Sequence, residues 1–405
     1  MPLQIAPILS TLSRHKFTAT LMVLQIALTC AIICNAVFLI SDRLRWMDTP
    51  SGIDEDRIVR ILVSDIGRRT DVHARVEADL AALRAVPGVE AATVSNSVPF
   101  GSTSWSTTIK LTPDQRIASA EVAAYYGENI AQTFGTRLVA GRYIQPDEYT
   151  WIDDFKAQAD RSSWTAMLTQ DLANKLFPGE SAVGKSLIIG DATFRIVGVV
   201  DRLAQGGSTD TAEIHHAVLL PYRMIPSYGA GFTIRARPGE AARALTGSVA
   251  ALKAVDPRRV IVDKRLYPEI RSRFFAADRA TTVLLVGICV ALLVVTALGI
   301  VGLASFWVAQ RRRQIGVRRA LGARRVDVLR YFQTENFLLA SMGVALGMAL
   351  AYGINLIMMR AYELPRLPLY YLPIGAVVLW LLGQAAVLAP ALRAASVPPV
   401  EATRG

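Results

Sequence analysis

The stretch ATTVLLVGICVALLVVTALGIVGLASFWVAQ, residues 280–310, runs for 31 residues without a charged side chain. A helix needs about 20 apolar residues to cross a bilayer. At a rise of ~1.5 Å per residue this run extends about 46 Å, so we expect its helix to begin as a stalk outside the membrane. Three further uncharged runs are long enough to span a bilayer and complete a set of four predicted transmembrane helices: residues 17–41, 336–359 and 367–392.

The first of these runs has the position of a signal peptide. Its apolar stretch is longer than the roughly 7 to 15 residues of a signal h-region. The sequence Ser41-Asp42-Arg43-Leu44-Arg45 that follows offers no small-residue cleavage site. We therefore expect residues 17–41 to be an uncleaved membrane anchor.

The distribution of charge predicts the topology. The 405-residue chain has 44 Lys and Arg against 33 Asp and Glu, a net charge of +11. Most of this excess lies in residues 1–17, 311–335 and 393–405, whereas residues 42–279 are nearly neutral. Short basic loops stay in the cytoplasm, and long domains translocate regardless of charge. We expect both termini and the link 311–335 inside, and the large domain 42–279 outside.

Residues 1–16 have the pattern of an amphipathic helix. Apolar side chains recur at helical spacing in this segment at Ile5, Ile8, Leu9 and Leu12. A helix with one apolar face lies in the plane of the membrane interface. We expect the N-terminal segment to lie there, and residues 393–405 to form a cytoplasmic tail.

The large domain shows the same layout at its two ends. Residues 57–96 and residues 231–265 each indicate a strand, a helix and a strand. Two such β-α-β units predict one α/β layer closed around an inserted subdomain at about residues 105–225. The insertion is rich in turns, and residues 187–200 indicate a hairpin. The predicted fold class is an α+β membrane protein: four transmembrane helices, with a large α/β plus β-rich extracytoplasmic domain between spans one and two.

One segment of the insertion matches a nucleotide-binding pattern. Gly179 to Ser186 reads GESAVGKS, which fits the P-loop pattern G-x-x-x-x-G-K-[ST]. A working P-loop follows a strand and opens a helix, so that backbone N–H groups cradle phosphate. Here a helical pattern and Pro178 precede the segment and a strand follows it. We expect a structural turn.

Other catalytic and metal-binding signatures are weak. The three cysteines are too few for a disulfide framework. His215 and His216 are adjacent, so on a strand they would point to opposite faces. Two carboxylate pairs are typical of solvated loops: Asp147-Glu148 and Asp153-Asp154. We expect no enzymatic activity, no cofactor and no metal site in this chain.

The predicted spans hold no Asp, Glu, Lys, Arg or His. Transporters driven by their own ion coupling place such groups at membrane depth, so we expect the energy to come from elsewhere. Small residues that permit close helix approach occur in the third span, at Gly343, Gly347 and Ala351, and in the second, at Gly299 and Gly302. Packing within the bundle and a dimer seam both fit this pattern.

The Arg-rich link 311–335 is the most informative segment. Its first part, RRRQIGVRRALGA at 311–323, predicts a short helix that stops near Gly322. A second helix follows, with Val326, Leu329 and Phe332 spaced to face the membrane. Positive charge at this place anchors the topology. Because the link is held to the bilayer at both ends, it is poorly suited to a nucleic-acid groove. A docking surface for a cytoplasmic partner is the further interpretation beside the positive-inside anchor.

Segment 311–323 resembles the signature between the second and third spans of FtsX-like permeases, the membrane subunits of MacB-type ABC transporters. Three runs of the large domain are similar to the MacB-like periplasmic core domain: residues 134–142, 173–185 and 194–200. Residues 390–402 are similar to the family's ending. The resemblance therefore extends over essentially the whole chain.

The resemblance implies a permease of the bacterial inner membrane with its large domain in the periplasm. A cytoplasmic ATPase pair would bind beneath two copies of this subunit, or beneath this subunit and a paralogue. The second-span stalk would carry ATP-driven motion to the periplasmic domain for efflux or export. The residues implied in ATPase coupling are Arg311, Arg312, Arg313, Gln314, Ile315, Gly316, Arg318, Arg319, Ala320, Leu321, Gly322 and Ala323.

The sequence differs from the family in two respects, and several alternative functions stay open. Gln314 stands where many relatives carry Glu, and MacB itself carries its ATPase in the same chain, so we expect a separate ATPase polypeptide here. A periplasmic adaptor, an outer-membrane duct and membrane lipids are further partners of the family. Relatives of the same shape release lipoproteins or signal by activating a periplasmic partner, and a ligand-sensing receptor is a more distant alternative. The substrate stays open.

Overall fold

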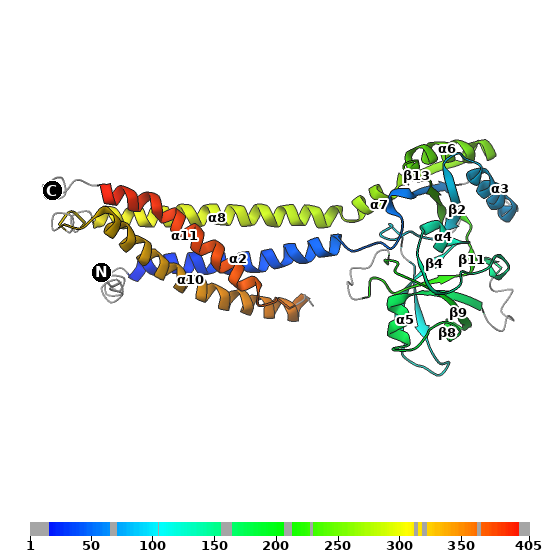
Figure 1. Ribbon diagram of the computed structural model, residues 1–405, viewed down its shortest axis with the longest axis horizontal. Coiled ribbons are helices and arrows are strands. Elements are labelled where there is room, and N and C mark those ends of the chain that lie inside the picture. The colour runs from blue at the N-terminus through cyan, green and yellow to red at the C-terminus, as the bar shows by residue number, and fades with distance from the viewer. Residues whose placement is uncertain are drawn as a thin grey trace. The chain divides into compact units, whose positions relative to one another are not determined.

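The computed structural model describes residues 16–64, 71–103, 105–154, 164–205, 213–226, 230–311, 315–317, 322–362 and 366–396 (Figure 1). The chain divides into two compact units. One, the helical unit, combines Met1–Met47 with Asp278–Gly405, and the other, the α/β unit, is Asp48–Ala277. The predicted N-terminal amphipathic helix lies outside the described residues.

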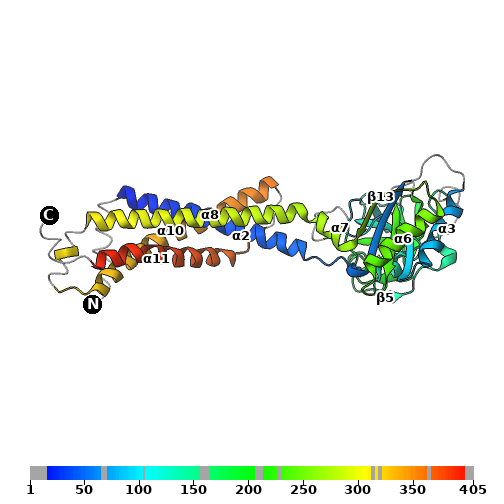
Figure 2. The same ribbon diagram turned by 90° about the horizontal axis from the view of Figure 1, so that it is seen from above.

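The helical unit contains four helices that are long and apolar enough to cross a membrane. They are α2 (Lys16–Met47), α8 (Ala276–Gln310), α10 (Arg325–Tyr362) and α11 (Tyr371–Ser396). They run lengthwise beside one another in both views (Figures 1 and 2). The predicted fold class, four transmembrane helices with a large α/β domain between the first two, is confirmed.

The second helix predicted in the link is not a separate element. It forms the first turns of α10, which continues into the third span without a break. Val326 is 52% exposed, whereas Phe332 is 5% exposed and belongs to the core of the bundle. The expectation that Phe332 faces the membrane was wrong, because a continuous helix turns that side chain toward its neighbours.

Small residues let α10 lie directly against α2. A Cβ atom added at Gly347 would come within 2.7 Å of the Ala27 carbonyl oxygen. One added at Gly343 would come within 3.0 Å of the Val23 carbonyl oxygen. One turn beyond Gly347, the Asn35 side-chain amide donates to the carbonyl oxygen of Ala351 at 3.1 Å. Side chains larger than hydrogen at the two glycines would separate the two backbones.

The helices and strands of the α/β unit are as follows. The helical segments are η1 (Glu55–Arg57), α3 (Val72–Arg84), α4 (Ile130–Phe134), η2 (Pro146–Glu148), α5 (Gln170–Leu176), α6 (Ala241–Val255) and α7 (Tyr267–Phe274). The strands are β1 (Ile58–Ser64), β2 (Val89–Ser95), β3 (Ser106–Lys110), β4 (Ala120–Tyr126), β5 (Leu138–Gly141), β6 (Thr150–Trp151), β7 (Trp164–Thr169), β8 (Ser186–Ile189), β9 (Ala192–Val200), β10 (Ala217–Leu220), β11 (Tyr222–Arg223), β12 (Gly231–Ala236) and β13 (Val260–Leu266).

Four strands from the two ends of the unit form one antiparallel sheet in the order β13-β1-β12-β2. The two β-α-β segments interlock, because β12 lies between β1 and β2 while β1 lies between β12 and β13. This is the split β-α-β arrangement of ferredoxin-like folds. Alternate residues of β1, such as Val59 and Ile61, pack with α3 and α6 in one hydrophobic core. The opposite face of the sheet carries Arg60.

The remaining strands lie between β2 and β12 in the chain. Seven of them form a sheet in the order β5-β9-β7-β10-β4-β3-β8. An additional pairing of β8 with β9 closes it into a barrel. Its interior is apolar, with buried side chains from several strands: Ile109, Val122, Leu168, Phe194, Ile196 and Val218. The short strands β6 and β11 form a separate parallel pair.

The packing of α10 on α2 predicts different effects for two glycines of α10. We expect Gly347→Ala to destabilise the protein by about 1–3 kcal/mol, because the new methyl group overpacks the contact with Ala27. Gly353→Ala is the matched control, since a Cβ there meets nothing within 4 Å. It should be neutral or stabilising by up to about 1 kcal/mol through helix propensity. Thermal unfolding in detergent measures both, and equal melting temperatures would contradict the close packing.

Candidate functional site

The helix α8 has two parts that pack differently. Near its end, Ile300, Ala304 and Trp307 are buried in the core shared with α2, α10 and α11. Its earlier part is mostly uncovered, with Val283, Leu298 and other apolar side chains exposed. In the most apolar stretch of α8 only 17% of the residues are buried, whereas 56% are buried in the corresponding stretch of α2. The first part of α8 therefore has little apolar contact with the rest of the helical unit.

Polar side chains hold this uncovered part to α2. The hydroxyl groups of Thr29 and Thr296 lie 2.8 Å apart in a buried hydrogen bond. One turn away, the Gln25 side-chain amide donates to the carbonyl oxygen of Val295 at 3.3 Å. Arg43 forms an ion pair with Asp278 near the start of α8. Interhelical hydrogen bonds of this kind contribute about 0.6 to 2 kcal/mol each, so this part of α8 is held weakly.

A buried ion pair joins the end of α8 to α10. Nη1 of Arg311 lies 3.0 and 3.1 Å from the two carboxylate oxygens of Glu335. The two side chains are only 8% and 2% exposed. The Arg311 guanidinium also lies 5.8 Å from the centre of the Trp307 ring. Because each charge is removed from water, neither can lose its partner without a large cost.

In the segment after Arg311, the described residues 315–317 are helical and pack on α10 through Ile315. The backbone N–H of Ile315 donates to the carbonyl oxygen of Arg311 at 3.0 Å. The Ile315 side chain is 7% exposed and shares a core cluster with Val328. At Gly322 the backbone has a φ of +97°, which favours glycine. The chain then enters α10, where the Asp327 carboxylate accepts the Arg324 N–H at 2.9 Å, one half of a capping box.

The structure places only part of the proposed coupling segment. Arg311, Ile315, Gly316, Gly322 and Ala323 are described. The other seven lie outside the described residues: Arg312, Arg313, Gln314, Arg318, Arg319, Ala320 and Leu321. Of the small residues singled out, Gly299 lies beneath the Gln25 side chain of α2, whereas a Cβ at Gly302 would meet nothing within 4 Å.

Sequence reasoning missed Glu335 and the threonine pair. Glu335 directly precedes the third apolar run, so its only signal was a carboxylate at the end of a link that contains eight arginines. Thr29 and Thr296 are uncharged residues inside apolar runs, and 267 positions separate them. Only the three-dimensional packing brings such residues together.

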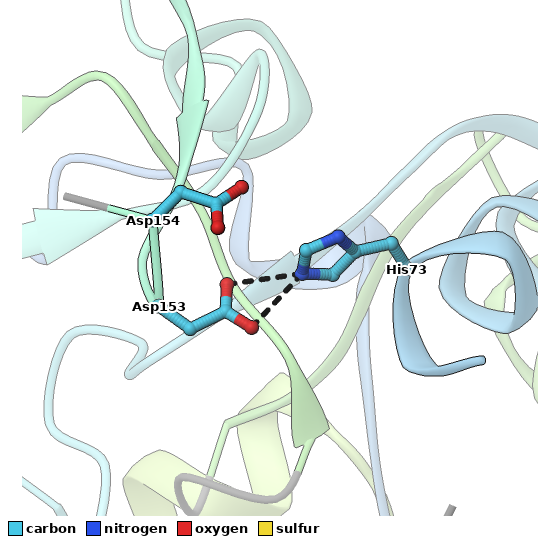
Figure 3. A group of neighbouring side chains, drawn as sticks. All are labelled: His73, Asp153 and Asp154. Atoms are coloured by element: carbon cyan, nitrogen blue, oxygen red, sulfur yellow. Dashed lines mark hydrogen bonds and ion pairs between the residues drawn. The ribbon is translucent and has the colours of Figure 1, made fainter. Parts of the chain in front are cut away.

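A second group of polar side chains lies in the α/β unit (Figure 3). Nε2 of His73, on α3, lies 3.0 Å from both carboxylate oxygens of Asp153, and Asp154 follows in the same turn. The His73 ring stacks on Trp151 with ring centres 4.1 Å apart. A His and two carboxylates are ligands that Zn²⁺ accepts. However, the His73–Asp153 contact and the stacking by themselves account for this geometry.

The P-loop-like segment has the surroundings of a structural turn. It follows helix α5 and precedes strand β8, the reverse of the order that a phosphate loop requires. Lys185 forms an ion pair with Glu180 and lies over the Phe177 ring at 4.6 Å. The Gly184 N–H donates to the carbonyl oxygen of Ile196 at 2.8 Å. The lysine and this backbone N–H are thus already engaged within the protein.

Comparison with known protein families identifies the family of this chain. The model of the MacB-like periplasmic core domain matches residues 20–252, more than half of the chain. The chain belongs to this family. A second model, FtsX-like permease C-terminal, matches residues 286–399, which include most of α8 and all of α10 and α11. The chain is therefore an ABC transporter permease of the MacB/FtsX type, a multi-pass membrane protein with a MacB-like periplasmic core domain.

Relatives of this MacB-family permease share part of their length with it. The macrolide export ATP-binding/permease protein MacB of Bartonella henselae is 29% identical over 295 residues, 69% of this chain and 40% of that protein. The MacB of Shewanella oneidensis is 29% identical over 313 residues, 73% of this chain and 43% of that protein. The chain spans less than half the length of these curated relatives.

A solved structure is also similar to part of the chain. The crystal structure of the periplasmic region of MacB from Actinobacillus actinomycetemcomitans is 16% identical, with a TM-score of 0.35. It covers 55% of this chain and 94% of that one.

The buried ion pair predicts a large stability effect that a compensating change removes. We expect Glu335→Gln to destabilise the permease by about 3–5 kcal/mol, because Arg311 stays charged and buried without its carboxylate. The double variant Arg311→Met, Glu335→Met replaces the pair with apolar side chains and should unfold near the wild-type temperature. Thermal unfolding in detergent measures both. A Glu335→Gln protein as stable as the wild type would contradict the buried pair.

Proposed function

We propose that this permease transmits the motion of a cytoplasmic ATPase along α8 to its periplasmic domain and thereby drives efflux or export. Two features of α8 support this role. In the chain, α8 follows α7 of the periplasmic core domain after Phe275 alone and leads directly into segment 311–323. Most of its length is held to α2 by a few polar contacts, so displacing it costs only a few kcal/mol.

The ion pair is the observation that carries the proposal. It joins α8 to α10 where the coupling segment begins, so a push on that segment reaches both helices together. The compact contacts among α2, α10 and α11 would then act as a fixed support. The weakly held part of α8 would shift against this support and carry the motion outward.

The source of energy is proposed to be ATP hydrolysis on a separate subunit. The four apolar runs contain no Asp, Glu, Lys, Arg or His for ion coupling, and the P-loop-like segment is a turn of the periplasmic domain. The relatives from Bartonella and Shewanella are named ATP-binding/permease proteins. Two copies of this chain, or one copy with a paralogue, would flank one ATPase pair.

The charge distribution supports a cytoplasmic location for the coupling segment. Nine of the eleven net positive charges lie in residues 1–17, 311–335 and 393–405. Retention of short basic segments in the cytoplasm would put both termini and the link on the ATPase side of the inner membrane. Work done on a periplasmic substrate needs no polar path through the helices, which agrees with their apolar composition.

The proposal predicts that charge reversal in the coupling segment separates the permease from its ATPase. We expect the triple variant Arg312→Glu, Arg313→Glu, Arg318→Glu to lose co-purification with the ATPase. The matched control reverses three exposed arginines of the same link, Arg324, Arg325 and Arg330, and changes the charge equally. It should retain the ATPase. Protease protection checks that both variants insert with the wild-type topology.

If the first triple variant still binds the ATPase and stimulates ATP hydrolysis normally, segment 311–323 is not the docking site. Loss of the ATPase from both variants would also count against it, because the effect would then depend on total charge. The substrate is tested separately, by comparing exported peptides and lipids and drug resistance between a deletion strain and its parent.

A further inference from the structure

A cavity of about 330 Å³ lies on the face of the four-stranded sheet that is turned away from α3 and α6. Its walls come from β1, β13, α7 and the loop 98–103. The charged side chains that line it are Arg60, Arg265, Arg273 and Asp263. Three positive groups and one negative group give this lining a formal charge of +2 when all are ionised.

Arg60 is buried without a negative partner among the described residues. It is 7% exposed, and Nη1 donates to the hydroxyl groups of Ser95 and Thr233. Nη2 donates to the carbonyl oxygens of Ser95 and Asn96, at 3.1 and 3.2 Å. All of these acceptors are neutral. Burial lowers the pKa of Arg60 to about 10, so the guanidinium is still charged at neutral pH. A buried charge without a counter-charge is costly.

The sheet register adds a second positive charge beside the first. Arg60 on β1 is the direct cross-strand partner of Arg265 on β13. Like charges in such positions destabilise a sheet. Asp263 reduces this repulsion only in part, because it lies 3.1 Å from Nε of Arg265 and belongs to that pair.

The third arginine comes from α7. Arg273 is exposed and has no ion-pair partner among the described residues. Loop 98–103 also lines the cavity with Ser102 and Thr103, and the Thr103 hydroxyl donates to the carbonyl oxygen of Asn96 at 3.4 Å. The sheet, the helix and the loop thus bring cations and hydroxyl groups to one cavity.

The loop has a strained backbone at this point. Phe100 has a φ of +52°, which is rare for a bulky residue. Its ring packs against Phe274 and Phe275, with ring centres 5.2 and 5.0 Å away, and these two rings also contact each other at 4.8 Å. Such strain persists where the surrounding packing enforces it, and it concentrates at binding sites. Here the enforced conformation fixes the loop over the cavity.

We propose that this cavity binds a phosphate group at Arg265 and Arg273, while the buried charge of Arg60, whose Nη groups already donate to protein acceptors, adds to the positive potential of the lining. A phosphate carries up to two negative charges, which match the formal charge of the lining, and its oxygens suit the planar fork of arginine. The bound group would join α7 to the sheet through Arg273. The phosphate belongs either to a membrane lipid headgroup or to a soluble phosphate ester. The proposal does not depend on the coupling role of α8.

The test uses the full-length permease in detergent and in phosphatidylcholine nanodiscs. Inorganic phosphate is titrated against the detergent sample, and phosphatidylglycerol is added to the nanodiscs, with thermal unfolding and native mass spectrometry as readouts. We expect saturable stabilisation of the wild type by at least one of the two probes. The double variant Arg265→Gln, Arg273→Gln should weaken it by at least about tenfold.

The matched control removes the same charge from two positions that do not line the cavity. Lys264 is exposed on β13, paired across from Ile61, whose side chain faces α3 and α6, and Arg279 is exposed on α8. Lys264→Gln, Arg279→Gln should bind like the wild type. The single variant Arg273→Gln is a second test that should leave the fold intact, because Arg273 is exposed. It should also weaken phosphate binding.

The two probes separate the two sources of the phosphate. Binding of inorganic phosphate points to a soluble ester, and an effect confined to phosphatidylglycerol points to a lipid headgroup. Either outcome supports the site. The site is overturned if neither probe binds saturably to the wild type, or if the cavity variants bind as tightly as the control.

Discussion

The buried ion pair between Arg311 and Glu335 is the contact on which the helical unit depends. Two charges that lie 3.0 Å apart with almost no exposure are stable only together. Their pairing fixes the end of α8 against α10, at the point where the apolar run of α8 ends and that of α10 begins. Charges at membrane depth are costly, which explains why the four long runs of these helices contain no charged side chain. The uncharged runs and the buried pair both follow from the high cost of an unpaired charge that is removed from water.

A consequence of this arrangement is that α8 differs from its three neighbours. Close backbone contact at Gly343 and Gly347 joins α2 to α10, and van der Waals packing of this kind resists displacement. By contrast, the first part of α8 is held to α2 by polar contacts with three α2 side chains, Thr29, Gln25 and Arg43. A helix held by side-chain hydrogen bonds can shift with small free-energy changes. In the account proposed here, this difference in packing lets ATPase motion pass along one helix.

The sequence was sufficient for the four helices and for the α/β character of the large domain, because span length and strand or helix periodicity are local properties. It was insufficient where partners are distant in the chain. Glu335 looked like the edge of a span, although α10 runs unbroken through it. Arg60 and Arg265 looked like ordinary strand residues until the register of β1 with β13 placed them side by side. In the same way, nothing in the sequence connected His73 with Asp153.

We propose that α8 moves against α2 during transport, and a reversible tether between these two helices would block that movement. Thr29→Cys and Thr296→Cys introduce the tether at the 2.8 Å contact, in a chain whose Cys30, Cys34 and Cys289 are replaced by alanine. The measurement is substrate transport by the permease reconstituted with its ATPase. We expect oxidation to stop transport and reduction to restore it. Equal transport in the oxidised and reduced states, with the disulfide verified, would contradict it.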